Sequence, residues 1–411
     1  MSELLLGLDI GSSSVKASVV DVATGRPVAS AQSPAEEMAM LALQPGWAEQ
    51  DPDLWWQHVR NSISQCVKKV NAARIRAIGI SYQMHGLVVV GKDHKPLRQS
   101  IIWCDSRAVS IGETALRAFG EQFCLGHFLN SPGNFTASKL RWVKENEPST
   151  FEKIHKAMLP GDYIALRLTG EIVTTDTGLS EGIFWDYTTK SVSAELLDFY
   201  QIPLEILPPR KPVFSVQGTV TPAAAGELGL PQGIPVSYRA GDQPNNAFSL
   251  NVLKRGETAA TAGTSGVIYS VTDKNAYDSQ SRVNTFVHVN NTATSVSNGV
   301  LLCINGTGIT NSWLRKNVRA GGAAYEYAQM NDLAAGVPVG SHGLVILPFG
   351  NGAERVLGNR TINASISGLD FNRHTQAHLF SAAQEGIVFA LRYGFDVLRA
   401  MEVPSSVIKA G

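Results

Sequence analysis

The stretch from Leu4 to Val20, LLLGLDIGSSSVKASVV, decides the fold of this chain. Its first half is an apolar run that ends in Asp9 and Ile10, and apolar residues resume at Val15. Two such runs, separated by Gly and Ser, predict adjacent strands joined by a tight turn. Gly11 allows backbone torsions that a side chain would hinder. The sequence therefore predicts a β-hairpin close to the N-terminus.

The turn of this hairpin has the composition of an anion-binding site. Gly11, Ser12, Ser13 and Ser14 combine hydroxyl groups with a tight backbone whose N–H groups can point the same way. Asp9 would repel a phosphate there unless a cation lay between them, which favours a nucleotide bound together with Mg²⁺. The alternative for this stretch alone is an ordinary hairpin with a solvated Asp9.

A second stretch repeats the pattern. Residues 258–271 read TAATAGTSGVIYSV, and Gly263, Thr264 and Ser265 align with the residues of the first turn. Thr261 stands where the first copy has Asp9, so a carboxylate is present in the first copy alone. Two such units predict two related domains that face one nucleotide, although two short hairpins could also be similar by chance.

The length and composition set the class of protein. With 411 residues the chain has room for two domains, which we place at 1–240 and 241–411. Lys plus Arg and Asp plus Glu both total 35, so the charge gives no indication of binding to nucleic acid or to a membrane surface. The four scattered cysteines, the absence of a signal peptide and the absence of a spanning apolar run indicate a cytoplasmic protein with reduced thiols.

Polar side chains follow the ends of two predicted strands. Gln83 and His85 come after the strand of residues 74–81, and Asp105 and Arg107 come after residues 101–103. Ligands of α/β folds bind at strand ends, and a sugar needs donors, acceptors and an aromatic wall such as Trp103. Each of these residues also has an alternative role. His85 could bond a backbone carbonyl, and Asp105 and Arg107 could form a local ion pair. Met84 and Trp103 could be packing residues.

Several other segments have readable patterns. Asp51 followed by Pro52 predicts the start of a helix, and residues 135–144 predict another. We expect residues 87–90 and 101–103 to form a hairpin. Residues 170–185 predict strands and turns, in which Asp176, Glu181 and, just beyond, Asp186 are turn or surface carboxylates. The alternative for Asp176 is a side chain that reaches a pocket.

Asp242 follows the apolar strand of residues 234–240 and precedes a predicted helix. Capping of that helix is one interpretation of this carboxylate. The other places it at the domain junction beside the γ-phosphate of a nucleotide. In that role we expect an ordinary carboxyl pKa of about 4, so that the group is charged at neutral pH.

The motifs together resemble the FGGY carbohydrate kinases of the actin-like ATPase superfamily, in family order along the whole chain. The motifs that carry the resemblance are Asp9–Lys16, Trp47–Pro52, Gln83–Gly86, Trp103–Arg107, Leu159–Tyr163, Ala240–Asp242, Gly263–Gly266 and Pro348–Phe349. The resemblance implies two ribonuclease H-like domains that flank a cleft. The family's second domain continues beyond the position of Gly411, which implies a C-terminally truncated second domain that lacks most of the adenine pocket and leaves the activity of this chain in question.

The resemblance also implies roles for individual residues. Asp242 corresponds to the base that accepts the sugar hydroxyl proton, and Asp9 to the residue that organises Mg²⁺. The sugar-binding positions are Gln83, Met84, His85, Trp103, Asp105 and Arg107. The nucleotide-binding positions are Gly11, Ser12, Ser13, Ser14, Lys16, Gly263, Thr264, Ser265 and Gly308.

The implied reaction is phosphorylation of a ketopentose by ATP. D-xylulose is the expected acceptor, because family members that phosphorylate D-xylulose have a similar Gln-Met-His-Gly motif in their sugar pocket. Gluconate, L-ribulose and glycerol remain alternatives. So do an actin- or chaperone-like ATPase without a sugar substrate and a sugar-binding module without catalysis. The expected partners are the sugar and ATP, with a homodimer possible by resemblance.

Overall fold

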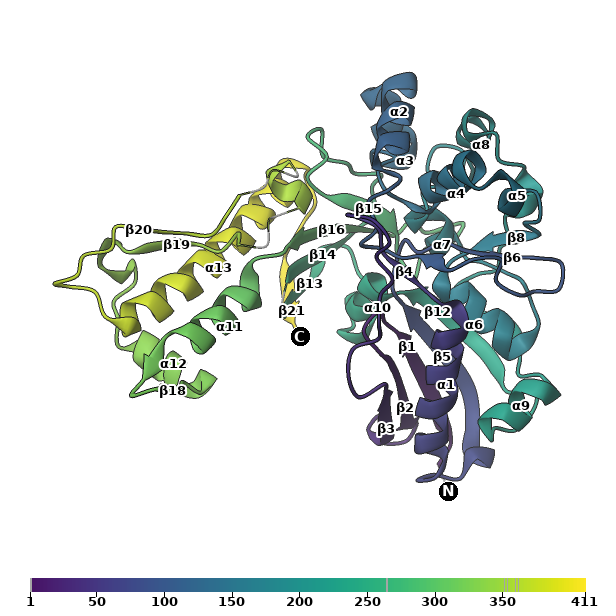
Figure 1. Cartoon of the computed structure of the whole chain (residues 1–411), viewed down its shortest axis with the longest axis horizontal. Helices are drawn as coiled ribbons and strands as arrows, with labels where there is room; N and C mark the ends of the chain where they lie inside the picture. Colours follow the sequence, from purple (N-terminus) through teal and green to yellow (C-terminus); the bar gives the residue numbers. More distant parts are fainter. Residues whose placement is uncertain (1, 264, 351, 353, 359, 361) are drawn as a thin grey trace. The chain divides into compact units, whose positions relative to one another are not determined.

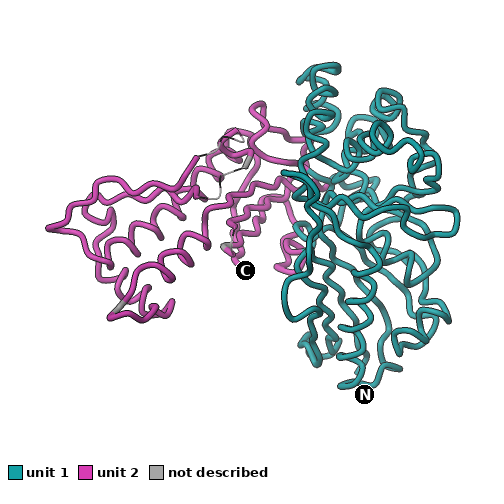
Figure 2. The backbone as a smooth tube through the Cα atoms, viewed as in Figure 1, with its two compact units in different colours: residues 1–245, 286–296 teal, residues 246–285, 297–411 magenta. Residues whose placement is uncertain are grey.

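The computed structural model of the chain describes residues 2–263, 265–350, 352, 354–358, 360 and 362–411. The chain divides into two compact units, shown in separate colours in Figure 2. Unit 1 comprises residues 1–245 and 286–296, and unit 2 comprises residues 246–285 and 297–411. Each unit contains its own β-sheet flanked by helices, which confirms the predicted α/β class with two sheet-rich domains.

Unit 1 is organised around a six-stranded sheet in the order β11-β12-β5-β1-β2-β3 (Figure 1). β1 and β2 form the predicted antiparallel hairpin, in which Ile10 pairs with Val15, and β3 continues it antiparallel to β2. On the other side of β1, β5 and β12 run parallel to it. The strands are β1 (Leu4–Ile10), β2 (Val15–Asp21), β3 (Pro27–Ser33), β5 (Ile75–Tyr82), β11 (Gly218–Thr219) and β12 (Pro235–Gly241).

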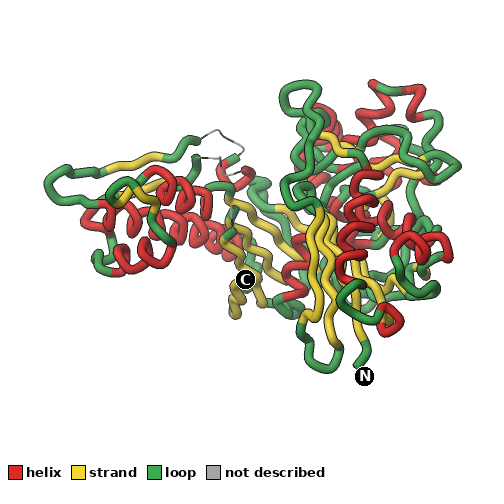
Figure 3. Tube along the Cα trace, turned by 60° about the horizontal axis from the view of Figure 1, so that its bottom comes forward, coloured by secondary structure: helices red, strands yellow, loops and turns green. Residues whose placement is uncertain are grey.

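One face of this sheet is covered by helices. Alternate residues of β1 are buried, from Leu4 to Ile10, whereas Leu5 and Gly7 on the opposite face are exposed and Asp9 is half-buried. The buried face packs against α1 (Pro52–Val67), α6 (Pro160–Thr169) and α9 (Pro222–Leu228) in one apolar core. The helices and strands of this layer are distinguished by colour in Figure 3.

The chain adds further short strands and helices, most of them between β5 and β12, whereas β4 precedes β5 and α10 follows β12. The expected hairpin of residues 87–90 and 101–103 is present only as an antiparallel bridge between Leu87 and Ile101, because its two strands otherwise pair elsewhere: β6 with β8, and β7 with β4. The elements are β4 (Glu49–Gln50), β6 (Val88–Val90), β7 (Ser100–Ile101), α2 (Val109–Phe119), α3 (Glu121–Phe128), α4 (Thr136–Asn146), α5 (Pro148–Phe151), β8 (Lys156–Met158), α7 (Asp176–Glu181), β9 (Trp185–Asp186), β10 (Ser191–Val192), α8 (Ala194–Tyr200) and α10 (Asp242–Ser249).

The sheet of unit 2 repeats the central pattern of unit 1. β13 and β14 form an antiparallel hairpin, β16 is antiparallel to β14, and β21 is parallel to β13, just as β2, β3 and β5 are arranged around β1. A helix again packs on the second and third of these strands, α13 here and α1 in unit 1. The strands are β13 (Glu257–Ala262), β14 (Gly266–Thr272), β15 (Asn284–Val287), β16 (Asn298–Ile304) and β21 (Val407–Ala410). The matched pairing supports the internal repeat predicted from the two hairpin sequences.

The other elements of unit 2 extend from this sheet along α13 (Figure 1). They are α11 (Thr307–Asn317), β17 (Arg319–Ala320), β18 (Ala323–Ala324), α12 (Tyr327–Ala335), β19 (Val345–Leu347), β20 (Ser365–Ser367) and α13 (Gln376–Ala400). Within the described part of the chain, none of the helices combines the length and the apolar composition that crossing a membrane requires.

Candidate active site

The turn between β1 and β2 is a compact loop with an ion pair at its base. Gly11 N donates a hydrogen bond to Ser14 O over 3.1 Å, which closes the turn, and Ser13 is exposed at its tip. Asp9 and Lys16 are directly paired across the two strands, with 3.5 Å between Oδ2 and Nζ. The structure thus brings the predicted metal-binding carboxylate and the predicted phosphate-binding turn onto one strand end.

The segment after β5 turns sharply at His85. This residue has a φ of 61°, and its Nδ1 donates a hydrogen bond to Glu181 O over 2.8 Å. Its ring packs against Phe135 and Phe286 at centroid distances of 4.8 and 5.3 Å. Met84 is buried beside it. His85 therefore makes the hydrogen bond to a backbone carbonyl that the alternative interpretation predicts. Its side chain is nevertheless only half-buried at the end of β5.

Gln50 connects the sugar-binding and phosphate-binding segments. Its Nε2 donates to Ser12 O over 2.6 Å, and its Oε1 accepts from Gln83 Nε2 at 3.4 Å and from Trp55 Nε1 at 3.1 Å. Trp103, which is half exposed, donates from Nε1 to Ser12 Oγ over 3.3 Å. The Oε1 atom of Gln83 is buried and has no hydrogen-bond partner among the described residues, so it is available to a ligand hydroxyl. Gln50 belongs to a motif quoted from the sequence, but its connecting role depends on contacts that the sequence does not reveal.

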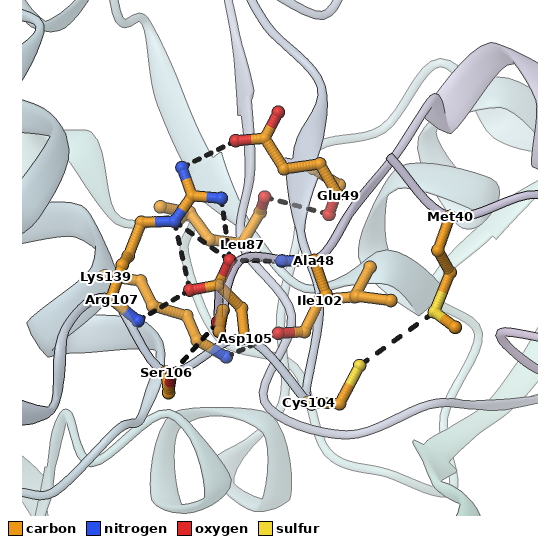
Figure 4. A network of polar contacts seen from close by, with 12 residues as sticks. Met40, Ala48, Glu49, Leu87, Ile102, Cys104, Asp105, Ser106, Arg107 and Lys139 are labelled. Atoms are coloured by element: carbon orange, nitrogen blue, oxygen red, sulfur yellow. Dashed lines mark hydrogen bonds and ion pairs between the residues drawn. The ribbon is translucent and has the colours of Figure 1, made fainter. Parts of the chain in front are cut away.

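Asp105 and Arg107 form a buried ion-pair network and do not present free polar groups to a pocket (Figure 4). The Asp105 carboxylate accepts from Arg107 Nη2 at 2.7 Å and from Ala48 N at 2.6 Å. Arg107 also pairs with Glu49 at 2.6 Å, and its guanidinium lies 3.8 Å from the Trp47 ring centroid. Both groups are engaged with protein partners, which favours the ion-pair interpretation, and their predicted contact with sugar remains a prediction.

Lys139 of α4 joins the two strand-end segments. Its fully buried Nζ donates to His85 O over 2.8 Å. The same group donates to Ile102 O over 2.9 Å (Figure 4). Burial lowers the pKa of this ammonium group to about 7, and the Asp105 carboxylate only partly offsets that effect. Lys139 lies in the helix predicted for residues 135–144. Its burial is not expected from the sequence, because lysine side chains are almost never fully buried unless they are paired.

Asp242 is the first residue of α10, directly after the end of β12, and is half-buried. Its pKa is raised to about 7, first by burial and then by the negative charge of Asp9, while hydrogen bonds from Gln243 favour the ionised form less strongly. The expectation of an ordinary carboxyl pKa is therefore wrong. The structure brings Asp242 within the electrostatic reach of Asp9, and the catalytic and metal-binding roles of these two residues remain predictions.

Two of the predicted surface carboxylates are buried. Residues 176–181 form the helix α7, where strands and turns are expected, and Glu181 at its end is only 1% exposed. Asp186 is fully buried and accepts hydrogen bonds from His127 Nδ1 at 2.9 Å and from Thr188 N at 2.7 Å. Asp176 is half-buried and pairs with Arg210 at 3.1 Å. For Asp186 the turn alternative is confirmed, because its carboxylate accepts from the amides of Thr188 and Thr189 in the turn that follows it. The surface assignment is wrong for both Glu181 and Asp186, because distant segments of the chain bury them.

Unit 2 contains a pocket of about 640 Å³ at the N-terminus of α11. Gly263 and Gly308, predicted separately as nucleotide-binding residues, both line it, and Gly308 N donates to Gly263 O over 3.0 Å. Close approach is required here, because a Cβ on Gly306 would lie 1.4 Å from Pro348 O. Ser265 hydrogen-bonds Asn305 at 3.3 Å, and the predicted Thr264 lies outside the described residues.

The wall of this pocket has features that sequence reasoning missed. They come from α11 and α12 and include the half-exposed rings of Trp313 and Tyr327, the Lys316 side chain and the Asn311 amide. Asn311 Oδ1 is buried without a hydrogen-bond partner among the described residues. Aromatic faces, a cation and a helix N-terminus are suitable for a nucleotide. The spacing of Asn311, Trp313 and Lys316 along α11 is the one sequence signal for this wall, and it can be interpreted only once the pocket is known.

No preformed metal cage is present: across the described ranges, no cluster of three or more His, Cys, Asp or Glu residues could hold an ion. This is compatible with Mg²⁺, which keeps several waters and typically uses one or two carboxylates together with substrate phosphates. Asp9, with a side chain that is 41% exposed, fits that limited requirement.

Two hairpins with matching sheets, a carboxylate of raised pKa beside polar strand ends and a glycine-lined pocket at a helix N-terminus define a two-domain α/β phosphotransferase. The family model described as the N-terminal domain of the FGGY family of carbohydrate kinases matches residues 4–249, more than half of the chain. The chain belongs to this family of carbohydrate kinases, whose activity uses ATP.

Relatives and solved structures agree with this assignment. The chain is 28% identical to the xylulose kinase of Haemophilus influenzae, an alignment that covers 99% of this chain and 82% of that protein. It is 29% identical to the xylulose kinase of Bacillus subtilis, with 96% and 77% covered. The crystal structure of xylulose kinase from Rhodospirillum rubrum superimposes with a TM-score of 0.85 at 30% identity, covering 98% of this chain and 80% of that one. The gluconate kinase of Lactobacillus acidophilus gives a TM-score of 0.86 at 26% identity, with 100% and 82% covered.

Proposed function

We propose that this protein transfers the γ-phosphoryl group of ATP to the terminal O5 hydroxyl of D-xylulose, which yields D-xylulose 5-phosphate and ADP. The relatives named xylulose kinase support this acceptor. The observation that carries the proposal is Asp242, a half-buried carboxylate of raised pKa at the strand end next to the Met84–His85 segment. We further propose that the protein acts in the cytoplasm, and the homodimer remains a prediction.

Asp242 is the general base in this proposal. As the O5–H bond breaks, the proton moves to the Asp242 carboxylate, while the O5–P bond forms and the bond to the ADP oxygen breaks. A base is most effective when its pKa lies near the working pH, and the raised pKa of about 7 meets that condition. Phosphoryl transfer otherwise needs alignment and charge stabilisation more than covalent participation by the protein.

The remaining polar groups bind and orient the two substrates. Gln83, Met84, His85 and Trp103 are the proposed sugar contacts, and Gln50 fixes Gln83 relative to the Ser12 carbonyl. The Gly11–Ser14 turn and the pocket of unit 2 are the proposed phosphate and nucleotide contacts. Asp9 would hold Mg²⁺, which when bound supplies positive charge against the phosphate oxygens.

A panel of acceptors tests this proposal. ADP release is measured by a coupled assay with D-xylulose, L-ribulose, gluconate and glycerol, each with ATP and Mg²⁺. We expect the highest kcat/KM with D-xylulose. Gluconate is the second candidate because a gluconate kinase superimposes about as well as the xylulose kinase. ADP release at the same rate without any acceptor would instead indicate an ATPase and refute the kinase assignment.

A further inference from the structure

Glu181 is a buried carboxyl group that the proposed reaction does not use. It ends α7 and is 1% exposed. Its backbone carbonyl accepts the hydrogen bond from His85 Nδ1 at 2.8 Å, so the end of this helix is attached to the predicted sugar-binding segment.

The Glu181 side chain packs against the backbone that leads into Asp242. A Cβ placed on Gly241 would lie 2.5 Å from Glu181 Oε2 and 2.5 Å from Met84 Cγ. Both atoms therefore occupy the space beside the α-carbon of Gly241. The end of β12, which carries the base, is in this way held between Glu181 and the sugar-binding segment.

The groups that face the Glu181 carboxyl are mostly acidic. Asp242 of α10 and Asp162 of α6 both disfavour a charge on it, and the nearby His85 amide and Tyr82 hydroxyl favour a charge less strongly. Neither carboxyl oxygen has a hydrogen-bond partner among the described residues. Arg239 of β12 is engaged with Asp162, at 2.9 Å between Nε and Oδ1. Burial and then the two aspartates raise the pKa of Glu181 well above its ordinary value.

We propose that Glu181 is a positioning residue that braces the base-carrying end of β12 against the Met84–His85 segment. This inference rests on the proposed function, because it assumes the role of Asp242 as base. Glu181 acts as a neutral carboxylic acid: it fills the space beside Gly241 without adding a second negative charge next to the ionised base. Above the pH at which Glu181 loses its proton, the carboxylates of Glu181 and Asp242 would both be charged. Their repulsion would displace the end of β12 from its position beside the Met84–His85 segment.

Two substitutions separate size from charge. We expect the wild-type kcat/KM to decline at high pH, where Glu181 ionises. Glu181→Gln keeps the size of the neutral acid and cannot ionise, so it should retain kcat/KM at pH 7 and lack this decline. Glu181→Ala removes the brace and should lower kcat/KM about 10²-fold, the effect of a misplacement of about 1 Å at a reacting group. Glu113→Gln makes the same chemical change at an exposed position of α2 and should leave the whole pH profile unchanged.

The proposal is overturned if Glu181→Ala is as active as the wild type. It is also overturned if Glu181→Gln keeps the wild-type decline at high pH, or loses as much activity as the alanine variant, because the ionised carboxylate would then be the required form. Thermal unfolding of each variant identifies any that fail to fold.

Infrared difference spectroscopy tests the protonation of Glu181 independently of activity. In the full chain at neutral pH, where Asp242 also contributes to the protonated-carboxyl C=O band, we expect this band to be as intense in Glu113→Gln as in the wild type and weaker in Glu181→Gln. Equal bands in the wild type and Glu181→Gln would contradict a neutral Glu181. If the wild type releases no ADP with D-xylulose, the proposed acceptor is wrong, whereas the infrared result still decides the state of Glu181.

Discussion

Replacement of Gly241 by alanine perturbs the candidate site at its most crowded backbone position. Gly241 is the last residue of β12 and precedes Asp242. The added Cβ would lie 2.5 Å from both Glu181 Oε2 and Met84 Cγ. Neither atom can leave easily, because both residues are buried.

The magnitude follows from these distances. Ordinary contact begins at 3.4 Å, so the neighbours or the strand end must move by about 0.9 Å in total for each contact. Over-packing of this kind costs about 1–3 kcal/mol of stability. A displacement of about 1 Å in a group that contacts the reacting atoms lowers the rate about 10²-fold. We therefore expect kcat/KM for D-xylulose to fall about 10²-fold in Gly241→Ala.

The assay is coupled ADP release at pH 8, where the base is ionised, together with urea unfolding of the same samples. Gly226→Ala is the matched control: Gly226 lies within α9, and its added Cβ would meet no atom within 4 Å. That variant should keep its activity and gain about 0.4–1 kcal/mol of stability. Wild-type kcat/KM in Gly241→Ala would refute the crowded arrangement of Glu181, Met84 and Gly241.

Four further outcomes are expected. Asp105→Asn breaks a buried ion pair and should lower the free energy of unfolding by about 3–5 kcal/mol; a raised KM with unchanged stability would instead indicate direct sugar contact. The pKa of Lys139 is about 7 in the folded state against 10.5 ordinarily, so the unfolded chain binds more protons between these values. The free energy of unfolding should therefore rise with pH across that range, and Lys139→Met should remove this slope in urea titrations at several pH values. The wild-type kcat/KM should fall as the pH drops below about 7, since the base Asp242 becomes protonated; a flat profile from pH 5 to 8 argues against that assignment. Trp313→Ala should weaken ATP binding measured by calorimetry up to about tenfold, because an aromatic contact contributes about 0.5–1.5 kcal/mol, and unaltered binding would exclude this pocket.

The main features of the fold could be predicted from local patterns. The β1–β2 hairpin follows from two apolar runs around Gly11–Ser14, and α1 begins where Asp51 and Pro52 indicate, with Asp51 accepting a hydrogen bond from Asp53 N. The second hairpin, β13–β14, was visible as a repeat of the first, and its sheet has the same pairing. Strand alternation and helix caps are local signals, so one sequence is sufficient to detect them.

The surroundings of the candidate site could not be predicted in the same way. Glu181 belongs to a helix of six residues among Thr and Gly residues, too short to show a helical period, and its burial depends on Gly241 and Met84. Lys139 is buried because two backbone carbonyls from other segments accept its hydrogen bonds. The raised pKa of Asp242 arises from burial and from Asp9, more than two hundred residues away in the sequence. Each of these properties comes from tertiary contacts.

The role of Asp242 is tested most directly by comparing turnover and sugar binding in Asp242→Ala. ADP release with D-xylulose should fall about 10²–10⁴-fold, the usual contribution of a general base, while calorimetry shows D-xylulose binding close to that of the wild type. Turnover equal to that of the wild type in a folded Asp242→Ala protein would contradict the proposed mechanism.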